Sequence, residues 1–463
     1  MPHPDPTTAP AAAPASNVVA TASADALRAL IRRKSRLKGR QPEDASLQQV
    51  RLLLGPAPAD GYRRDLLIEY LHLLNDHFGC LHDHHLVALA REMRLPMAEV
   101  FEVASFYHHF DIVRGDEAAP GLTVRVCDSL ACSMVGAQDL LARLPVLLGA
   151  GRDGNGVRVL AVPCVGRCEQ APVVVVHQQP VPLATPEAVA ALVFKENRAL
   201  AHNSHAQAAI NFVASDWAEK SVSPPPQTTD MVPAFTGYAA YRAQGGYRLA
   251  AALAAGEVDA EGLIQAMENS GLRGLGGAGF PAGRKWRIVR DQPGPRLMAV
   301  NIDEGEPGTF KDRVYLERDP HRFLEGVLIA AQLVGVDACY LYLRDEYHGC
   351  RALLQAELAR LRADPPCGLP QIELRRGAGA YICGEESAMI ESIEGKRGEP
   401  RMRPPYIAQV GLFGRPTLEH NFETLYWVRD ILEKGPQWFS GFGRHGRKGL
   451  RSFSVSGRVN YPG

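Results

Sequence analysis

Apolar side chains recur every three or four residues through much of the first hundred residues, which is the spacing of amphipathic helices. A small helical bundle is therefore predicted over residues 23–119. The residues that carry this pattern are Leu66, Leu67, Tyr70, Leu73, Leu74, Leu86, Leu89, Met93, Val100, Val103 and Phe106.

The pattern changes near Pro120, where apolar and polar residues begin to alternate. Strands are predicted over 122–126, 157–162 and 173–176, and a short helix over 138–144 that Pro145 would end. Strands mixed with a helix predict a compact α/β unit over 120–196.

A third pattern begins near Phe235, where predicted helices and predicted strands alternate along the chain. Helices are predicted over 248–255, 260–269 and 322–334, and strands over 296–301 and 338–343. The β-α-β order is typical of a parallel sheet, so a Rossmann-like α/β domain is predicted over 234–463. The whole chain is thus predicted to be a multidomain α/β protein.

Composition refines this picture at several places. The chain has 463 residues with 51 basic and 51 acidic side chains, so no overall field favours nucleic acid or an anionic membrane. No apolar run is long enough to span a bilayer. Residues 1–22 are rich in Ala, Pro, Ser and Thr and are predicted to be a disordered tail, and 197–233 are predicted to be a linker. Residues 454–463 resemble a strand that enters a turn with nothing to pair against, which predicts a truncated C-terminus.

Nine cysteines without a secretory signal predict reduced thiols and a cytoplasmic protein. Four of them form two close pairs, Cys127 with Cys132 and Cys164 with Cys168, and each pair follows a predicted strand. Two loop pairs at neighbouring strand ends can place four thiolates around a [2Fe–2S] cluster. Zinc is the main alternative, although structural zinc pairs most often have two intervening residues. The other cysteines show no pairing and are interpreted as small buried side chains.

A glycine-rich loop, 274–280, follows the predicted helix over 260–269. Its glycines match G-x-G-x-x-G, but a dinucleotide fingerprint requires a strand before the loop, so an ordinary Rossmann turn is disfavoured. The loop can still bind a phosphate through backbone N–H groups, with Phe280 as a stacking surface. Two acidic stretches, 301–306 and 381–386, follow strand-like segments and offer carboxylates to the hydroxyls of a nucleotide or flavin. Solvated acidic loops are the alternative interpretation.

These residues resemble two subunits of respiratory complex I. Residues from about 60 to 195 resemble its thioredoxin-like iron–sulfur subunit, in Ala104-Ser105-Phe106-Tyr107 and in the cysteine quartet. Residues from about 235 onward resemble its NADH-binding flavoprotein subunit, in the segments 276–281, 304–313 and 377–386. Both modules in one polypeptide resemble the fused diaphorase subunit of NAD-reducing hydrogenases and NAD-dependent formate dehydrogenases.

The resemblance implies a thioredoxin-like [2Fe–2S] domain, an FMN-binding domain and oxidation of NADH through the flavin. It implies no general base, and hence no catalytic triad. It also implies partner subunits of a larger oxidoreductase complex, with neither nucleic acid nor membrane insertion. The implied cluster ligands are Cys127, Cys132, Cys164 and Cys168, and the implied FMN and NAD(H) contacts are Gly274, Gly276, Gly277, Ala278, Gly279, Phe280, Lys285, Asn301, Asp303, Glu304, Glu306, Tyr381, Gly384, Glu385, Glu386, Arg403 and Asn421.

The chain departs from the resembled family at several positions. Leu275 stands where Arg is usual, Arg403 and Tyr406 replace Lys and Phe near the NADH site, and His420 replaces the first of two Asn residues. The family's C-terminal C-x-x-C-x-x-C set for a [4Fe–4S] cluster is missing, and such a cluster is expected in a missing C-terminal region.

Three hypotheses follow. The first is an NADH:acceptor oxidoreductase module with FMN and one [2Fe–2S] cluster. The second is a non-enzymatic subunit that docks and relays electrons because its NADH pocket has degenerated. The third is a zinc-stabilised interaction module followed by an unrelated nucleotide-binding domain.

Overall fold

The computed structural model describes residues 39–115, 117, 121–150, 156–196 and 233–463. The predicted tail 1–22 and nearly all of the predicted linker 197–233 lie outside the described residues. Residues Pro42–Gly463 form one compact unit.

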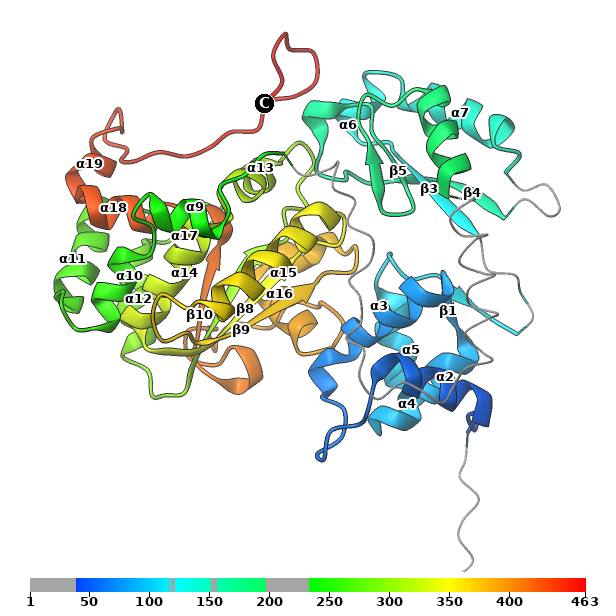
Figure 1. The fold of residues 1–463 in the computed structure, drawn as a ribbon, viewed down its shortest axis with the longest axis horizontal. Coiled ribbons are helices and arrows are strands. Elements are labelled where there is room, and N and C mark those ends of the chain that lie inside the picture. Colours follow the sequence, from blue (N-terminus) through cyan, green and yellow to red (C-terminus); the bar gives the residue numbers. More distant parts are fainter. Residues whose placement is uncertain (1–38, 116, 118–120, 151–155, 197–232) are drawn as a thin grey trace, which may run out of the picture. The chain divides into compact units, whose positions relative to one another are not determined.

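The first described region is helical, as the spacing of its apolar residues predicts (Figure 1). Its helices bury the apolar face that recurs at helical spacing, including Leu67, Leu71, Leu89 and Val103. Two short strands pair in parallel beside them. The elements are α2 (Asp44–Leu54), η1 (Arg64–Leu66), α3 (Leu67–Phe78), β1 (Leu81–His82), α4 (Asp83–Met93), α5 (Met97–Phe106) and β2 (Ile112–Val113).

The second region holds a four-stranded sheet in the order β4-β3-β5-β6. Strand β3 pairs in parallel with β4 and antiparallel with β5, and β5 and β6 form an antiparallel pair. The predicted strands are therefore present. The elements are β3 (Leu122–Cys127), α6 (Leu130–Ser133), α7 (Ala137–Leu147), β4 (Val157–Val162), η2 (Cys168–Gln170), β5 (Val174–Val176) and β6 (Gln179–Val181).

Pro145 does not end the helix before it, contrary to the prediction. Helix α7 continues to Leu147 with Pro145 inside it. Because Pro145 lies in the last turn, it removes one backbone hydrogen bond, while Leu148 still donates to Leu144 O at 2.9 Å. The helix therefore ends two residues beyond the proline.

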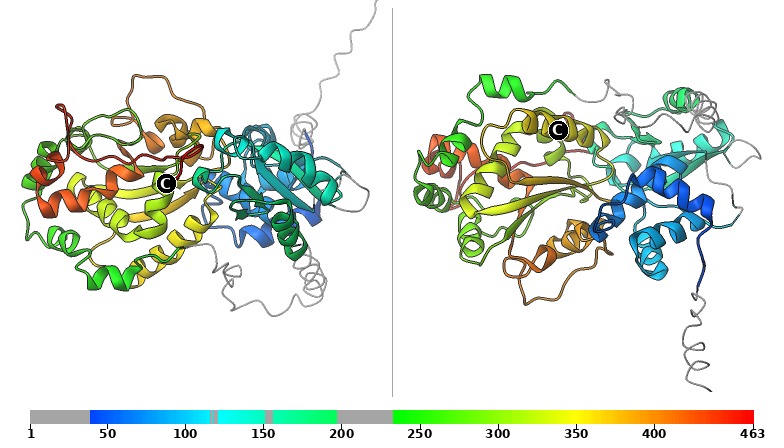
Figure 2. Two further views of the ribbon diagram at one scale, coloured as in Figure 1. Left: turned by 90° about the horizontal axis from the view of Figure 1, so that it is seen from above. Right: turned by 60° about the horizontal axis from the view of Figure 1, so that its bottom comes forward.

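The third region contains an all-parallel sheet in the order β10-β7-β8-β9, with helices packed against it (Figures 1 and 2). This sheet confirms the predicted β-α-β arrangement. The elements are α9 (Tyr238–Ala243), α10 (Arg248–Ala254), α11 (Ala260–Ser270), α12 (Ala282–Arg290), β7 (Arg296–Ile302), α13 (Lys311–Arg318), α14 (Pro320–Val334), β8 (Val336–Leu343), α15 (His348–Ala363), β9 (Gln371–Arg376), η3 (Tyr381–Gly384), α16 (Glu386–Ile393), η4 (Leu412–Gly414), β10 (Thr417–Asn421), α17 (Phe422–Tyr426), α18 (Val428–Lys434) and α19 (Pro436–Ser440).

The two faces of this sheet belong to different cores. Along β7, Met298 and Val300 pack with helices of the third region, whereas Leu297 and Ala299 belong to a second cluster that holds residues of the N-terminal helices together with residues of α16. The alternation follows from the two-residue period of a strand. The N-terminal helices thus share a core with the third region, whereas the pattern of the sequence predicts a bundle with a core of its own.

The residues after α19 contain no helix or strand, so the strand expected over 454–463 is not formed. Val455 and Gly463 instead exchange two backbone hydrogen bonds of 2.8 and 2.9 Å, which close a turn within this segment. The segment is drawn in red in Figure 1.

Candidate functional site

The four paired cysteines meet at one end of the second sheet. Cys127 is the last residue of β3, and Cys164 follows the neighbouring parallel strand β4. Cys132 lies on α6 and Cys168 begins η2. Because parallel neighbours place their carboxyl ends at the same edge of a sheet, the two loops come together there.

The thiols are buried and in contact. All four side chains are 1–4% exposed, and the sulfurs of Cys164 and Cys168 lie 3.2 Å apart. Hydrogen bonds with neighbouring thiols lower the pKa of Cys132 and Cys164 and raise the pKa of Cys127 and Cys168, since each of the latter pair donates its proton. Four buried sulfurs in one small volume fit a group that binds thiolates.

The remaining cysteines are separate from this quartet. Cys80, Cys339, Cys350 and Cys383 are buried, and burial raises the pKa of each thiol. Cys367 accepts a hydrogen bond from Gln332.

The glycine-rich loop joins α11 to α12, so a helix precedes it, as predicted. Asp259 caps α11 by accepting from the backbone N–H groups of Glu261 and Gly262. The loop closes on itself: Gly274 N donates to Phe280 O at 2.8 Å, and Arg273 Nε donates to Gly279 O at 2.6 Å.

Open space surrounds the middle of this loop. Gly277 has a φ of +125°, and a Cβ built on it would meet no heavy atom within 4 Å. A Cβ on Gly276 would lie 2.9 Å from Asn421, so the loop approaches the end of β10 closely. Phe280 is 39% exposed, with the Arg284 guanidinium 5.9 Å from its ring centroid. The open space beside Gly277 would let backbone N–H groups of the loop approach a phosphate-bearing group.

The first acidic stretch follows β7, at the carboxyl edge of the parallel sheet. Asn301 donates to Gly384 O at 2.9 Å, and Tyr381 donates to the carboxylate of Glu306, so the two acidic stretches contact each other. Asp303 Oδ2 is buried without a hydrogen-bond partner among the described atoms. Burial raises the pKa of Asp303 to about 7.

Glu304 has a structural use. Its carboxylate accepts from the N–H groups of Asp312 and Arg313 at the start of α13, at 2.9 and 3.2 Å, and from Tyr347 Oη at 2.9 Å. A carboxylate at a helix N-terminus satisfies free N–H groups and the helix dipole. Burial raises the pKa of Glu304 to about 7.

The second acidic stretch begins α16. Glu385 caps this helix by accepting from Ser387 N and Ala388 N. Arg403 forms ion pairs with Glu385 and with Glu386, the latter at 2.9 Å. Nearby, Lys285 Nζ lies 3.0 Å from Glu419 Oε2. The predicted polar residues are thus largely paired with one another, while Asp303 Oδ2 keeps its capacity to accept a hydrogen bond.

The residues that depart from the resembled family have local explanations. His420 is buried and accepts a hydrogen bond from Trp286 Nε1 at 2.8 Å. Leu275 packs against the core of the third region, and its backbone N donates to Thr424 Oγ1 at 2.9 Å. Tyr406 is 59% exposed. His420 is therefore part of the protein interior, and Leu275 is partly buried against the core.

Sequence reasoning missed a buried polar layer between the cysteines and the first acidic stretch. Arg344 donates to Cys164 O at 2.8 Å and also to Glu304 O. Arg313 donates to Gly166 O at 3.0 Å and pairs with Glu169 and Glu317. Arginines inside 304–313 and after a strand are a weak signal, because nothing in the sequence shows which distant carbonyls they reach.

A cavity of about 350 Å³ lies beside this layer. Its lining includes Cys164 from the quartet, Asp303 and Tyr381 from the acidic stretches, and His109 from the N-terminal region. The cavity does not reach the glycine-rich loop. The cavity is therefore lined jointly by residues of the quartet, of the acidic stretches and of the N-terminal region.

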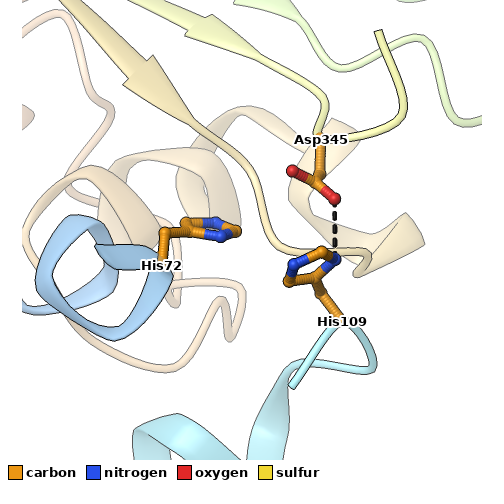
Figure 3. Close-up of side chains that lie close together, drawn as sticks. All are labelled: His72, His109 and Asp345. Carbon is orange, nitrogen blue, oxygen red and sulfur yellow. Dashed lines mark ion pairs between the residues drawn. The ribbon is translucent and has the colours of Figure 1, made fainter. Parts of the chain in front are cut away.

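His72, His109 and Asp345 also lie close together, with ligand-type atoms within 4.8 Å of one another (Figure 3). His109 Nδ1 is 2.7 Å from Asp345 Oδ2, and His72 Nε2 donates to Gly377 O at 2.8 Å. Arg376 and Arg351 pair with the other oxygen of Asp345. Their positive charge opposes a bound cation, so the arrangement fits a hydrogen-bonded cluster better than a metal centre.

Comparison with known proteins finds two matching segments, and they correspond to the two resemblances drawn from the sequence. Residues 57–196 match the family model of the thioredoxin-like [2Fe-2S] ferredoxin, and residues 267–430 match that of the Nuo51 FMN-binding domain. The chain is thus similar to these two domains in succession. The segment that matches the ferredoxin model carries the cysteine quartet, and the segment that matches the FMN-binding model carries the glycine-rich loop and both acidic stretches.

Relatives agree with this assignment. The chain is 43% identical over 232 residues to an NADH-quinone oxidoreductase subunit of Rhizobium meliloti (strain 1021), covering 48% of this chain and 55% of the relative. It is 45% identical over 213 residues to the mitochondrial NADH-ubiquinone oxidoreductase 51 kDa subunit of Neurospora crassa, covering 43% of each. The chain spans about half the length of these curated relatives.

The fold also matches a solved structure across both domains. The crystal structure of an NAD+-reducing [NiFe]-hydrogenase in its H2-reduced state aligns with a TM-score of 0.70 and 32% identity, over 87% of this chain and 66% of that one. No helix in the described part of the chain is long and apolar enough to cross a membrane.

Proposed function

We propose that this chain is an NADH:acceptor oxidoreductase (diaphorase) module that passes electrons between NAD(H), FMN and a [2Fe–2S] cluster. Its named relatives are components of NADH oxidoreductases, and its structural neighbour is an NAD+-reducing hydrogenase. We accordingly place the module in the cytoplasm, as part of a larger assembly with hydrogenase, formate dehydrogenase or complex I-like partners.

The observation that carries the proposal is the direct contact between the two candidate cofactor sites. Arg344 bonds the carbonyl of Cys164, a proposed cluster ligand, and the carbonyl of Glu304, in the acidic stretch proposed for the flavin. Electron transfer between two carriers requires that they be held close, and a buried arginine joins their loops. The cysteine edge and the acidic edge therefore belong to one electron path.

The domain limits and site residues follow from this assignment. We take residues 120–196 as the cluster-bearing unit, with Cys127, Cys132, Cys164 and Cys168 as ligands, and 234–463 as the flavin-bearing unit. The glycine-rich loop would hold the FMN phosphate, and the free oxygen of Asp303 would accept a hydrogen bond from the flavin. Phe280 would offer its exposed face to the nicotinamide nucleotide, with Glu306 and Glu386 beside it.

When bound, FMN would supply the conversion between two-electron hydride chemistry and one-electron transfer. The protein's contribution is positional. Backbone N–H groups of the glycine-rich loop bind the phosphate, and the Tyr381–Glu306 hydrogen bond holds the two acidic stretches together at the edge of the sheet. Burial of the quartet keeps water from the sulfurs.

The test is cofactor analysis of the purified chain followed by a diaphorase assay. We expect FMN, iron and acid-labile sulfide, together with NADH-dependent reduction of an artificial acceptor. Bound FMN without NADH oxidation would favour the electron-relay alternative. Zinc at the quartet with no iron would contradict the proposal.

A further inference from the structure

Arg344 directly follows β8 and carries a buried positive charge to the cysteine edge. Its guanidinium lies 5.1 Å from the centroid of the Tyr347 ring. Nη2 donates to Cys164 O at 2.8 Å, and Nη1 donates to Glu304 O. Cys164 is a proposed cluster ligand. The positive charge is therefore hydrogen-bonded to the backbone of a residue whose sulfur would bind iron.

Glu346 is the counter-ion of Arg344, and the two charges are unequally exposed. Glu346 Oε1 accepts from Arg344 Nη2 at 3.0 Å, and Oε2 accepts from Nε at 3.1 Å. The Glu346 side chain is 30% exposed, whereas that of Arg344 is 5% exposed. Water and salt screen an exposed charge more than a buried one. Arg344 thus bonds to Cys164 directly and is the less screened member of the pair.

The other arginines at this edge are paired more closely. Arg313, which donates to Gly166 O at 3.0 Å, and Arg167 both pair with Glu317. Arg313 pairs in addition with Glu169. Both of these carboxylates are less exposed than Glu346, so they offset the two arginines with less screening by water. Arg344 is therefore the arginine of this edge with the most solvated counter-ion.

We propose that the charge of Arg344 raises the reduction potential of the [2Fe–2S] site and that Glu346 opposes this effect. Reduction adds one electron, and hence one negative charge, to the cluster. A buried positive charge close to a ligand stabilises that form more than the oxidised form. Arg344 bonds to a ligand's carbonyl rather than to its sulfur, so it is a positioning residue. The inference rests on the proposed function for its cluster.

The test is a potentiometric EPR titration of the full chain carrying Arg344→Met. At the wild-type midpoint potential, we expect the ratio of reduced to oxidised cluster to fall about tenfold, which corresponds to ~59 mV for one electron. Arg344→Lys keeps the positive charge and loses the planar set of donors. It should therefore recover most of the wild-type ratio.

Glu346→Gln should shift the potential in the opposite direction. Removing the carboxylate leaves the charge of Arg344 unopposed, so the ratio of reduced to oxidised cluster should rise by about threefold, or ~28 mV. The shift is smaller because Glu346 is the more exposed partner. A purely structural ion pair gives no reason for opposite shifts in its two members. Glu346→Gln retains both carbonyl bonds of Arg344, so it decides the question if Arg344→Met fails to assemble the cluster.

Arg375→Met is the matched control. Arg375 is also buried, and its Nη1 also donates to a backbone carbonyl, Asp65 O, at 3.0 Å. Its carboxylate partners Asp65 and Glu373 belong to neither candidate site. We therefore expect a wild-type potential in this variant, even where its stability falls.

Three results would each overturn the inference and leave the proposed function intact. They are an unchanged or raised potential in Arg344→Met, an unchanged or lowered potential in Glu346→Gln, and a fall in Arg375→Met equal to that in Arg344→Met. Wild-type protein without iron at the quartet would instead overturn the proposed function.

Discussion

The cysteine quartet occupies two loops at one sheet edge and is 1–4% exposed, whereas the proposed flavin residues come from several loops and include Phe280 at 39% and Tyr381 at 65% exposure. A cluster needs a small closed set of like ligands. A flavin that meets a diffusing nucleotide needs one open side. The quartet is therefore a local site, and the flavin site depends on long-range packing.

The same contrast holds for charge. The quartet has no charged residue among its four ligands, and Cys164 Sγ contacts the thiol of Cys168 and the backbone amide of Gly166. The flavin edge is crowded with carboxylates, most of which are paired, as Glu304 is with α13 and Glu386 with Arg403. Substitutions in the first site should remove one cofactor cleanly, while those in the second should also alter protein stability.

The largest effect is expected for Cys164→Ser. Replacing a thiolate ligand should abolish or strongly weaken the EPR signal of the cluster, while FMN content stays near normal, because the quartet lies outside the flavin site. Cys367→Ser, outside the quartet, is the control. Loss of FMN with an intact cluster signal would contradict the division into two sites.

Gly277→Val should produce the opposite pattern. A branched side chain at a φ of +125° is strained and would enter the space meant for the phosphate, so FMN content should fall at least tenfold with the cluster retained. Gly256→Val carries a comparable strain away from the site. Unchanged flavin stoichiometry would remove this loop from the proposed site.

Arg313→Met tests the layer that joins the two sites. It leaves Glu169 without its arginine and breaks the bond to Gly166 O, so the free energy of unfolding should fall by about 3 kcal/mol. Urea unfolding of the loaded protein measures this. The exposed pair of Arg290 with Glu261 is the comparison, where Arg290→Met should cost less than about 1 kcal/mol. Equal losses would show that the layer contributes no more than a surface pair.

Asp303→Asn should have the smallest effect, visible in its pH dependence. Burial raises the pKa of Asp303 to about 7, so ionisation opposes folding, and the wild type loses stability as pH rises from about 4 through 7. In FMN-free protein the free energy of unfolding of the variant, relative to that of the wild type, should therefore rise across this window. Asp291→Asn is the matched surface control. A pH-independent difference would place the Asp303 carboxyl in water.

Much of the local structure could be predicted from the sequence. Alternating apolar residues identified β3 and β4, and the cysteine spacing identified a quartet that the fold brings together. Both signals depend only on residues close together in the sequence. The alternation reflects the two-residue period of a strand, and the cysteine spacing reflects the length of a loop. The extension of α7 past Pro145 was missed because a proline in a last turn removes only one hydrogen bond.

The polar layer could not be predicted in the same way. Arg344 reaches a carbonyl 180 positions away along the chain, and no spacing rule relates the two. Glu304 looked like a ligand-binding carboxylate because it follows a strand, yet its oxygens are used by α13. The roles of the individual flavin residues came from family resemblance, and their binding of FMN and NAD(H) stays a prediction.

The divided packing of the parallel sheet has a consequence for how the polypeptide can be cut. Leu297, Ala299 and Tyr340 belong to a buried cluster that side chains of α16 and of the N-terminal helices complete, and all of these belong to one continuous peptide chain. A fragment starting at residue 233 would expose the part of this cluster that the N-terminal helices cover, and exposed apolar surface promotes self-association. The peptide linkage keeps the N-terminal helices at a high effective concentration beside the sheet. Cutting the chain between them would therefore lower the stability of both fragments.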